Sequence, residues 1–420
     1  MLFRFSLYGF LKNQRYFEPF LILAFLEKGL SFTEIGLLIG FREVCVNLME
    51  VPTGAIADVL GRRRAMIFSS LGYIASFAVF GLLEPVWALF VAMFFFSIGE
   101  AFRTGTHKAM IFDWLSSQGR AGEKTKVYGF TRSWSQIGSA VSVVIAAGMV
   151  FTTKRYSAVF LASIPPYLAN IVNFLTYPRS LDGVAPERPS LGAVWRALAG
   201  SFRDCLSRRP LRRLLAEGMG FDGTYKAVKD YLQPVLKAAA LGLPVVIGLT
   251  DRQRTAVLVG AIYFVLYLLS SYASRHSDTL RRRAGSEDRA ARWLWWVDLA
   301  AFATLAAGVV AGAGFLAVGA FVVLAVLENS WRPILVSRFA EHADASKMAT
   351  VLSIESQARS LFSAALAPLV GLAVDAMGRL AGPAGGGDLR FLPIGVAGMV
   401  IASLMLATGR RAPAAGQSGG

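Results

Sequence analysis

Charged side chains recur at helical spacing inside long apolar stretches of this sequence. Glu100, Arg103 and His107 lie at positions i, i+3 and i+7, which a helix places along one stripe. A guanidinium group binds a carboxylate or a phosphate through two parallel hydrogen bonds. A carboxylate that is removed from water takes up a proton more readily than one in water. The stripe therefore predicts a site for an anionic or zwitterionic solute that also exchanges protons.

Similar stripes occur in six further stretches. The side chains that we predict to contact the solute are Gln14, Arg103, Arg132, Gln136, Lys226, Lys229, Arg332 and Arg359. The carboxylates that we predict to carry protons are Glu18, Glu50, Glu100, Asp222, Glu328 and Glu355. A structural alternative stays open for two pairs. Glu328 and Arg332 lie one turn apart, as do Glu355 and Arg359, so each pair could neutralise itself and join two helices without touching a solute.

The sequence contains no arrangement typical of an enzyme or a metal site. Its two cysteines, Cys45 and Cys205, lie far apart, as do the three histidines, His107, His276 and His342. No phosphate loop of the form G-x-x-x-x-G-K-[ST] occurs, which argues against a pump driven by ATP. We therefore expect no catalytic residue, no cofactor and no metal ion.

Composition shows what must hold these stripes in place. Of the 420 residues, 55 % are hydrophobic and only 17 % are charged, and the mean hydropathy is +0.52. Soluble domains carry roughly 25 % charged residues. Uncharged blocks cover residues 65–83, 133–153, 255–274 and 391–409. Each block has about the ~20 residues that a helix needs to cross a bilayer. Because the blocks are continuously apolar and do not alternate, they predict an all-α membrane protein and not a β-barrel.

Hydropathy and loop signals together predict twelve membrane-spanning helices. The first six lie near residues 6–28, 34–57, 65–83, 86–114, 125–151 and 156–177. The second six lie near residues 212–238, 254–276, 293–311, 315–339, 348–374 and 391–409. The apolar stretch 299–327 is too long for one span, and Ala311-Gly312-Ala313-Gly314 lies inside it. We therefore expect two spans joined there by a short hairpin.

Basic residues gather in alternate loops and explain the formal net charge of +16. The basic segments are 62–64, 120–126, 179–213, 281–283 and 410–411. This alternation follows the positive-inside rule, so we expect these loops and both termini in the cytoplasm of a bacterium, with the chain in the inner membrane. The expected partners are anionic lipids, a small-molecule solute and protons. We expect no nucleic acid, and we expect a monomer.

The chain divides into two halves. Residues 1–178 and 212–410 each hold six predicted spans, residues 179–211 form a cytoplasmic linker, and residues 411–420 form a disordered tail. Within the linker, Leu191 to Leu206 shows apolar residues at helical spacing with arginines between them. This pattern predicts an amphipathic helix on the inner membrane surface, with a plain linker as the alternative. Internal repeats are typical of transporters that bind their substrate at the repeat interface.

One loop resembles a family signature. Residues 54–64 read Gly-Ala-Ile-Ala-Asp-Val-Leu-Gly-Arg-Arg-Arg. This segment resembles the loop G-x-L-A-D-R-x-G-R-R-x that follows span two in the major facilitator superfamily. The resemblance implies two pseudo-symmetric six-helix bundles and a cytoplasmic gate in which the aspartate bonds toward span eleven. The implied gate residues are Gly54, Asp58, Gly61, Arg62 and Arg63. Val59 departs from the pattern, because the family usually has an arginine there.

The same resemblance implies where the charged stripes lie. In the family, spans one, four, seven and ten line a central cavity, and spans two, five, eight and eleven flank it. We therefore expect a proton-coupled secondary transporter of a small organic anion or zwitterion that works by alternating access. A multidrug/proton antiporter is the alternative, although span five lacks the glycine-proline motif of many such exporters over residues 138–148. A lipid flippase is a further alternative.

Overall fold

The computed structural model describes residues 1–104, 106–182, 206–242, 248–343, 348–382 and 389–409. The side chains of a few helical residues within these ranges, Asp58 among them, are also left undescribed. Two predictions fall outside the described residues. They are the amphipathic helix of the linker and the disordered tail 411–420. Cys205 lies in the same undescribed part of the linker.

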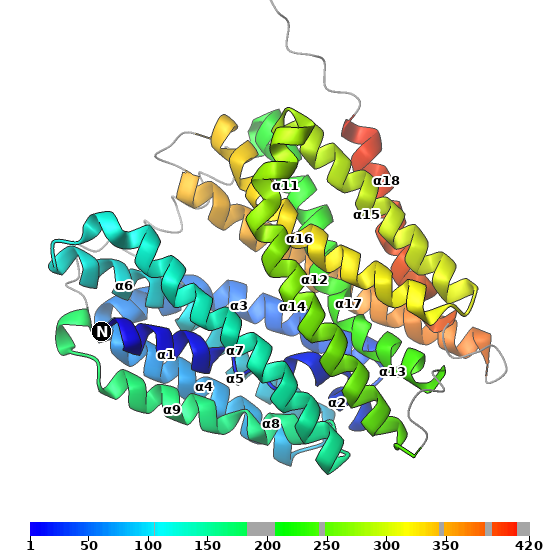
Figure 1. Ribbon diagram of the computed structural model, residues 1–420, viewed down its shortest axis with the longest axis horizontal. Helices are drawn as coiled ribbons and strands as arrows, with labels where there is room; N and C mark the ends of the chain where they lie inside the picture. Colours follow the sequence, from blue (N-terminus) through cyan, green and yellow to red (C-terminus); the bar gives the residue numbers. More distant parts are fainter. Residues whose placement is uncertain (105, 183–205, 243–247, 344–347, 383–388, 410–420) are drawn as a thin grey trace, which may run out of the picture. The chain divides into compact units, whose positions relative to one another are not determined.

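The described chain is helical, and each predicted span corresponds to one helix or to a series of short ones (Figure 1). In the first half these are α1 (Leu2–Lys12), η1 (Glu18–Phe20) and α2 (Leu21–Glu27) for span one, then α3 (Phe32–Leu60), α4 (Arg62–Leu82), α5 (Val86–Arg103) with α6 (Thr106–Ser117), α7 (Lys124–Thr153), and α8 (Ala158–Ala162) with α9 (Ile164–Leu175).

In the second half, span seven consists of α11 (Arg209–Gly218), the π-helical segment η4 (Met219–Gly223), α12 (Thr224–Val228), η5 (Lys229–Tyr231) and α13 (Leu232–Gly242). The remaining spans are α14 (Asp251–Ala284), α15 (Glu287–Val310), α16 (Gly314–His342), α17 (Met348–Ala381) and α18 (Leu392–Gly409). The predicted hairpin is confirmed, because α15 ends at Val310 and α16 begins at Gly314.

Nine helices of the described chain are long and apolar enough to cross a membrane. They correspond to spans three to six and eight to twelve. The three other predicted spans are not both long and apolar enough, for physical reasons. Spans one and seven are divided into short helical pieces, and α3 carries charged residues along its length, among them Glu34, Arg42, Glu43 and Glu50.

Span one is interrupted between Lys12 and Glu18, and a side chain from span seven repairs the interruption. In an unbroken helix the Ile22 N–H would donate to the Glu18 carbonyl. Here the Gln233 amide lies between the two groups. Its oxygen accepts from the Ile22 N–H at 2.8 Å, and its nitrogen donates to the Glu18 carbonyl at 2.8 Å. Gln233 is fully buried, so both backbone groups keep a partner without water.

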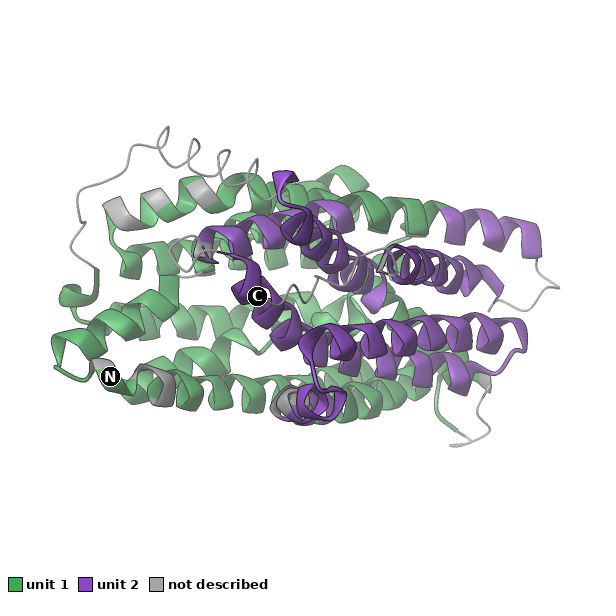
Figure 2. Ribbon diagram, turned by 90° about the horizontal axis from the view of Figure 1, so that it is seen from above, with its two compact units in different colours: residues 1–200, 230–268, 364–372 green, residues 201–229, 269–363, 373–420 purple. Residues whose placement is uncertain are grey.

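The chain forms two compact units, which are coloured separately in Figure 2. Unit 1 comprises residues 1–200, 230–268 and 364–372, and its tightest helix pair is α4 with α5. A Cβ on Gly72 would lie 3.0 Å from the Gly99 nitrogen, so only glycine lets these two helices approach so closely. The Ser69 hydroxyl then donates to the Gly99 carbonyl at 2.6 Å. This contact fixes the end of α5, where Glu100 and Arg103 lie.

Unit 2 comprises residues 201–229, 269–363 and 373–420. Its core is aromatic. The Phe221 ring stacks on Trp331 with centroids 4.3 Å apart and meets Trp295 edge to face at 5.0 Å. All three rings are buried, and they join the π-helical segment to α15 and α16. This packing holds Asp222, the neighbour of Phe221, at a defined position in the unit.

The Gln233 bridge leads to a prediction about stability. Gln233→Leu keeps a similar volume but removes the hydrogen bonds that Gln233 makes to the Ile22 N–H and to the Glu18 carbonyl. We expect a loss of about 2 kcal/mol or more in the free energy of unfolding, measured by chemical denaturation in detergent micelles.

The matched control is Gln118→Leu, because Gln118 is exposed at the end of α6. This control is expected to change the unfolding free energy by less than about 0.5 kcal/mol. Equal stability of the two variants would show that Gln233 does not bridge the interruption.

Candidate functional site

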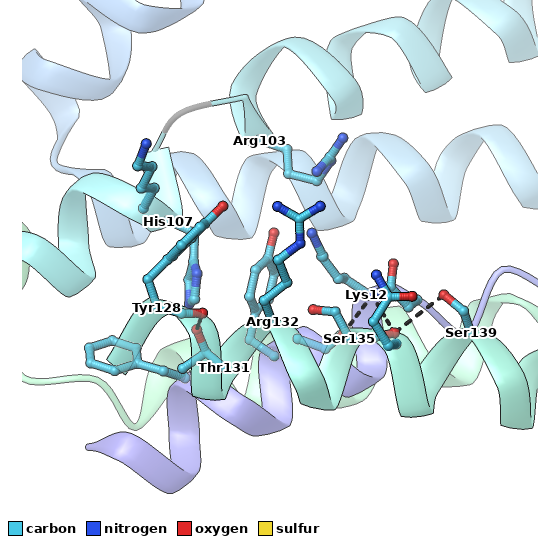
Figure 3. A pocket seen from close by; sticks show the side chains of 14 residues that line it. Lys12, Arg103, His107, Tyr128, Thr131, Arg132, Ser135 and Ser139 are labelled. Atoms are coloured by element: carbon cyan, nitrogen blue, oxygen red, sulfur yellow. Dashed lines mark hydrogen bonds between the residues drawn. The ribbon is translucent and has the colours of Figure 1, made fainter. Parts of the chain in front are cut away.

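A pocket of about 320 Å³ opens in unit 1 between α1, the α5–α6 junction and α7 (Figure 3). Its wall is mostly polar and carries four basic side chains. The lining residues are Phe5, Tyr8, Gly9, Lys12, Asn13, Arg103, His107, Lys108, Tyr128, Thr131, Arg132, Ser135, Gln136 and Ser139. None of these residues is acidic. The electrostatics of the wall therefore favour an anion.

Arg103 is held at the pocket wall by a partly buried network. The Glu100 carboxylate accepts hydrogen bonds from the Tyr73 hydroxyl and from the Arg103 guanidinium. The Arg103 Nε also donates to the Tyr73 hydroxyl at 3.3 Å, and Arg15 Nη2 lies 3.8 Å from the Glu100 carboxylate. One carboxylate thus serves two guanidinium groups. Glu100 fixes Arg103 in place, but its single negative charge cannot neutralise both Arg103 and Arg15.

Aromatic rings support the other cations of the pocket. The Lys12 ammonium lies 5.8 Å from the centre of the Tyr8 ring, and the Lys108 ammonium lies 5.5 Å from that of Tyr128. Tyr8 packs on His107 with ring centroids 4.0 Å apart. The His107 Nε2 atom is buried and has no hydrogen-bond partner among the described residues. This side of the pocket combines aromatic surface with positive charge.

The predicted solute-binding residues of the first half separate into two groups. Arg103, Arg132 and Gln136 line the pocket together. Gln14 does not, because its buried side chain donates to the Gly138 carbonyl of α7 at 3.1 Å and joins two helices. Glu18 and Glu50 also lie outside the pocket lining. The Glu18 carbonyl is the group that Gln233 binds.

Unit 2 contains a second cluster of charges that also lies within the apolar helices. Arg332 Nη1 donates to the Glu355 carboxylate at 2.6 Å and lies 3.7 Å from the Asp222 carboxylate. Arg359 Nη1 donates to the same oxygen of Asp222 at 3.2 Å. The side chains of Asp222 and Glu355 are 2 % and 0 % exposed. The second oxygen of each has no hydrogen-bond partner in the described part of the chain.

These pairs differ from the pairing within single helices that the sequence left open. Arg332 of α16 pairs with Glu355 of α17, and Arg359 of α17 pairs with Asp222 of span seven. The pairs therefore join three helices. Glu328 lies within electrostatic range of Lys229, Arg359 and Arg332, and Lys226 donates to the Ser360 hydroxyl at 3.0 Å. All seven predicted residues of the second half thus belong to one region of unit 2.

The signature loop between α3 and α4 docks against two acidic residues of unit 1. Gly61 has a φ of +91°, and a Cβ there would lie 2.8 Å from the Asp182 carboxyl carbon. The Arg63 N–H donates to the Asp182 carboxylate at 3.1 Å, and Arg62 forms an ion pair with Asp113 of α6. The predicted bond of Asp58 toward span eleven lies outside the described side chains.

Sequence reasoning missed several residues of the pocket and of the network that holds Arg103 at its wall. Arg15 was missed because it lies in the interruption of span one, where helical periodicity does not apply. Tyr73 and Tyr8 carry no charge, so a search for ionisable stripes passed over them. Lys108 stands near the end of its predicted span, where a lysine is typical of the membrane interface. Lys12 does not share the face that Gln14 and Glu18 form in span one. Among the described residues, no group of three histidine, cysteine, aspartate or glutamate side chains could hold a metal ion.

Comparison with known proteins places the chain in a group of transporters. A family model described as Major Facilitator Superfamily matches residues 13–368. Among solved structures, the nucleoside transporter NupG aligns with a TM-score of 0.78 at 12 % identity, covering 98 % of this chain and 99 % of that chain. A search of curated proteins found no match.

Two further solved structures resemble the chain. A POT family transporter in complex with 5-aminolevulinic acid aligns with a TM-score of 0.71 at 14 % identity, covering 98 % of this chain and 96 % of that chain. A bacterial homologue of the human lysosomal transporter Spinster aligns with a TM-score of 0.67 at 17 % identity, covering 98 % of each chain. At these identities the likeness shows a shared fold and nothing about the substrate.

The signature loop yields a prediction with a control inside the same motif. Gly61→Ala places a Cβ against Asp182 and forces an L-residue into a backbone region that favours glycine. We expect a loss of about 1–3 kcal/mol in the free energy of unfolding, measured by denaturation in detergent.

Gly54→Ala is the control, because no atom lies within 4 Å of a Cβ there and the residue is inside α3. This change should be neutral or stabilising by up to about 1 kcal/mol. If the two variants were equally stable, the docking of Gly61 on Asp182 would be wrong.

Proposed function

The chain belongs to the Major Facilitator Superfamily, and on that premise we propose that it moves a small organic anion across a membrane by alternating access, with protons as the coupling ion. The observation that carries this proposal is the pocket of unit 1. Four basic side chains, Lys12, Arg103, Lys108 and Arg132, line it, and no acidic residue does. A cationic drug would meet four like charges there, so the multidrug alternative is disfavoured on electrostatic grounds.

Selectivity for an organic anion follows from the side chains that line the pocket. Arg103 offers a planar donor that matches a carboxylate or a phosphate, and its orientation is set by Glu100 and Tyr73 before any solute arrives. The rings of Tyr8 and Tyr128 supply apolar surface for a carbon skeleton. A preorganised site of this kind binds its ligand without a large ordering cost.

The cluster in unit 2 supports proton coupling. Asp222 and Glu355 share Arg332, and both carboxylates are buried. When either carboxylate takes up a proton, Arg332 loses part of its counter-charge and its attraction for other anions rises. Release of that proton restores the pair. The cluster therefore has two charge states, which is the property that a proton-coupled cycle requires.

Loop charge supports an orientation for the chain. The basic loops and both termini would face the cytoplasm of a bacterial cell, with the chain in its inner membrane as a monomer. The loop that contains Gly54, Asp58, Gly61, Arg62 and Arg63 would then act as a gate on the cytoplasmic side. The two six-helix bundles would comprise residues 1–178 and 212–410, joined by the linker 179–211.

The anion specificity can be tested by thermal unfolding of the purified protein. We expect small carboxylates such as succinate to raise the unfolding temperature, and neutral amides and organic cations such as tetraphenylphosphonium to leave it unchanged. Arg103→Gln should abolish most of the rise, whereas Arg155→Gln, an exposed change outside the pocket, should preserve it. Stabilisation by cations in place of anions would contradict the proposal.

Proton coupling calls for a separate experiment in proteoliposomes with a transported anion. Asp222→Asn and Glu355→Gln should each reduce accumulation driven by a pH gradient to the level seen without a gradient. Exchange of labelled for unlabelled anion at equal pH should continue, because it needs no net proton movement. Glu341→Gln, an exposed change on α16, should behave as the unaltered protein does. Accumulation that survives both substitutions would exclude this cluster from coupling.

A further inference from the structure

Three of the basic side chains in the unit 1 pocket come from three different helices and point into the same space. They are Lys12 at the end of α1, Arg103 at the end of α5, and Arg132 on α7 (Figure 3). Arg103, Arg15 and Arg132 lie within electrostatic range of Lys12, and each repels it. A convergence of like charges inside a membrane-embedded helix bundle is unfavourable unless an anion compensates it.

The acidic residues near these cations do not balance them. Glu100 acts on Lys12, Arg15 and Arg103, and Glu18 acts on Arg15. Neither carboxylate lines the pocket. Among these groups, the basic ones, Lys12, Arg15, Arg103 and Arg132, outnumber the two acidic ones by two. Lys108, which also lines the pocket, adds to this excess of positive charge. No ion pair of Lys12 or Arg132 occurs within the described chain.

We infer that the pocket binds a small organic molecule that carries two negative charges close together, as a dicarboxylate or a phosphate monoester does. This inference rests on the proposed transport of an organic anion and narrows its substrate class. A monoanion would leave more of the excess positive charge of the wall uncompensated than a dianion would. The three cations approach from three helices, so they can bind several oxygen atoms from different sides.

The neutral groups of the pocket fit the rest of such a molecule. Gln136 and Ser135 line the wall next to Arg132, and the rings of Tyr8 and Tyr128 flank it. These groups offer hydrogen bonds and apolar contact for a short carbon skeleton with hydroxyl or carbonyl substituents. The exposed Lys108, which lies over the Phe112 and Tyr128 rings, adds a further positive charge on that side.

The charge requirement can be measured with matched pairs of probes. Succinate is compared with monomethyl succinate, which has nearly the same shape and one charge fewer, and glycerol 3-phosphate is compared with glycerol. Binding is followed by calorimetry on the purified protein in a neutral detergent. We expect each dianion to bind on the order of tenfold more tightly than its partner. Arg132→Gln and Lys12→Gln should each reduce this preference severalfold, while Arg155→Gln should preserve it.

The outcomes separate this inference from the proposed function. Equal affinity for succinate and its monoester would overturn the dianion inference and leave anion transport standing. If Arg132→Gln weakened the binding of succinate and of its monoester by the same factor, the dianion inference would be overturned as well. If no organic anion bound, the anion specificity of the proposed function would fall together with it.

An anionic lipid headgroup carries the same phosphate chemistry, so the source of the anion needs its own test. Binding is repeated in nanodiscs of pure phosphatidylcholine and in nanodiscs that contain phosphatidylglycerol. Similar affinity for the dianion in both supports a free solute. Loss of dianion binding with phosphatidylglycerol, together with no uptake of labelled dianion into proteoliposomes, would overturn the solute assignment in favour of a lipid site.

Discussion

A charged group inside the hydrocarbon region of a membrane requires a partner, and this constraint organises both units of the protein. In unit 1 the Glu100 carboxylate is bound by Tyr73 and Arg103 and approached by Arg15. In unit 2 the Asp222 and Glu355 carboxylates share Arg332 of α16, and Asp222 also binds Arg359 of α17. Most of these intramembrane charged side chains are thus paired with other side chains of the protein. Among the described residues, the pocket cations Lys12 and Arg132 depart from this pattern because neither forms an ion pair, and the solute is therefore assigned to them.

Irregular backbone positions several of these charged groups. Arg15 lies where span one is interrupted, Asp222 lies in the π-helical segment of span seven, and Lys229 begins a 3-10 turn of the same span. A break in a membrane helix exposes backbone groups that must find other partners. Gln233 supplies them in span one. Such segments are frequent at functional sites, because they turn a side chain away from the regular helical face.

Sequence reasoning predicted the spans well, because hydropathy reports directly on the bilayer. The predicted spans and the hairpin at 311–314 follow from it, and nine of these spans are long and apolar enough to cross a membrane. The family fold was implied by the signature loop at 54–64 and is established by family membership. Periodicity could place Glu355 and Arg359 on one stripe of α17, but it could not tell that each pairs with a different helix. Helical phase also fails across a break, so Arg15 could not be assigned. The partner of Gly61, Asp182, lies more than a hundred residues away, and no local pattern connects them.

The proposed binding site for the organic anion lies in unit 1, against Lys12, Arg103 and Arg132. The most direct measurement is a crystal structure of the protein with a transported anion that carries bromine, such as bromosuccinate, recorded at the bromine absorption edge. We expect one anomalous peak inside this pocket, with the carboxylates of the ligand within hydrogen-bonding distance of the three cations. A peak elsewhere in the protein, in a sample that transports the same anion, would contradict it.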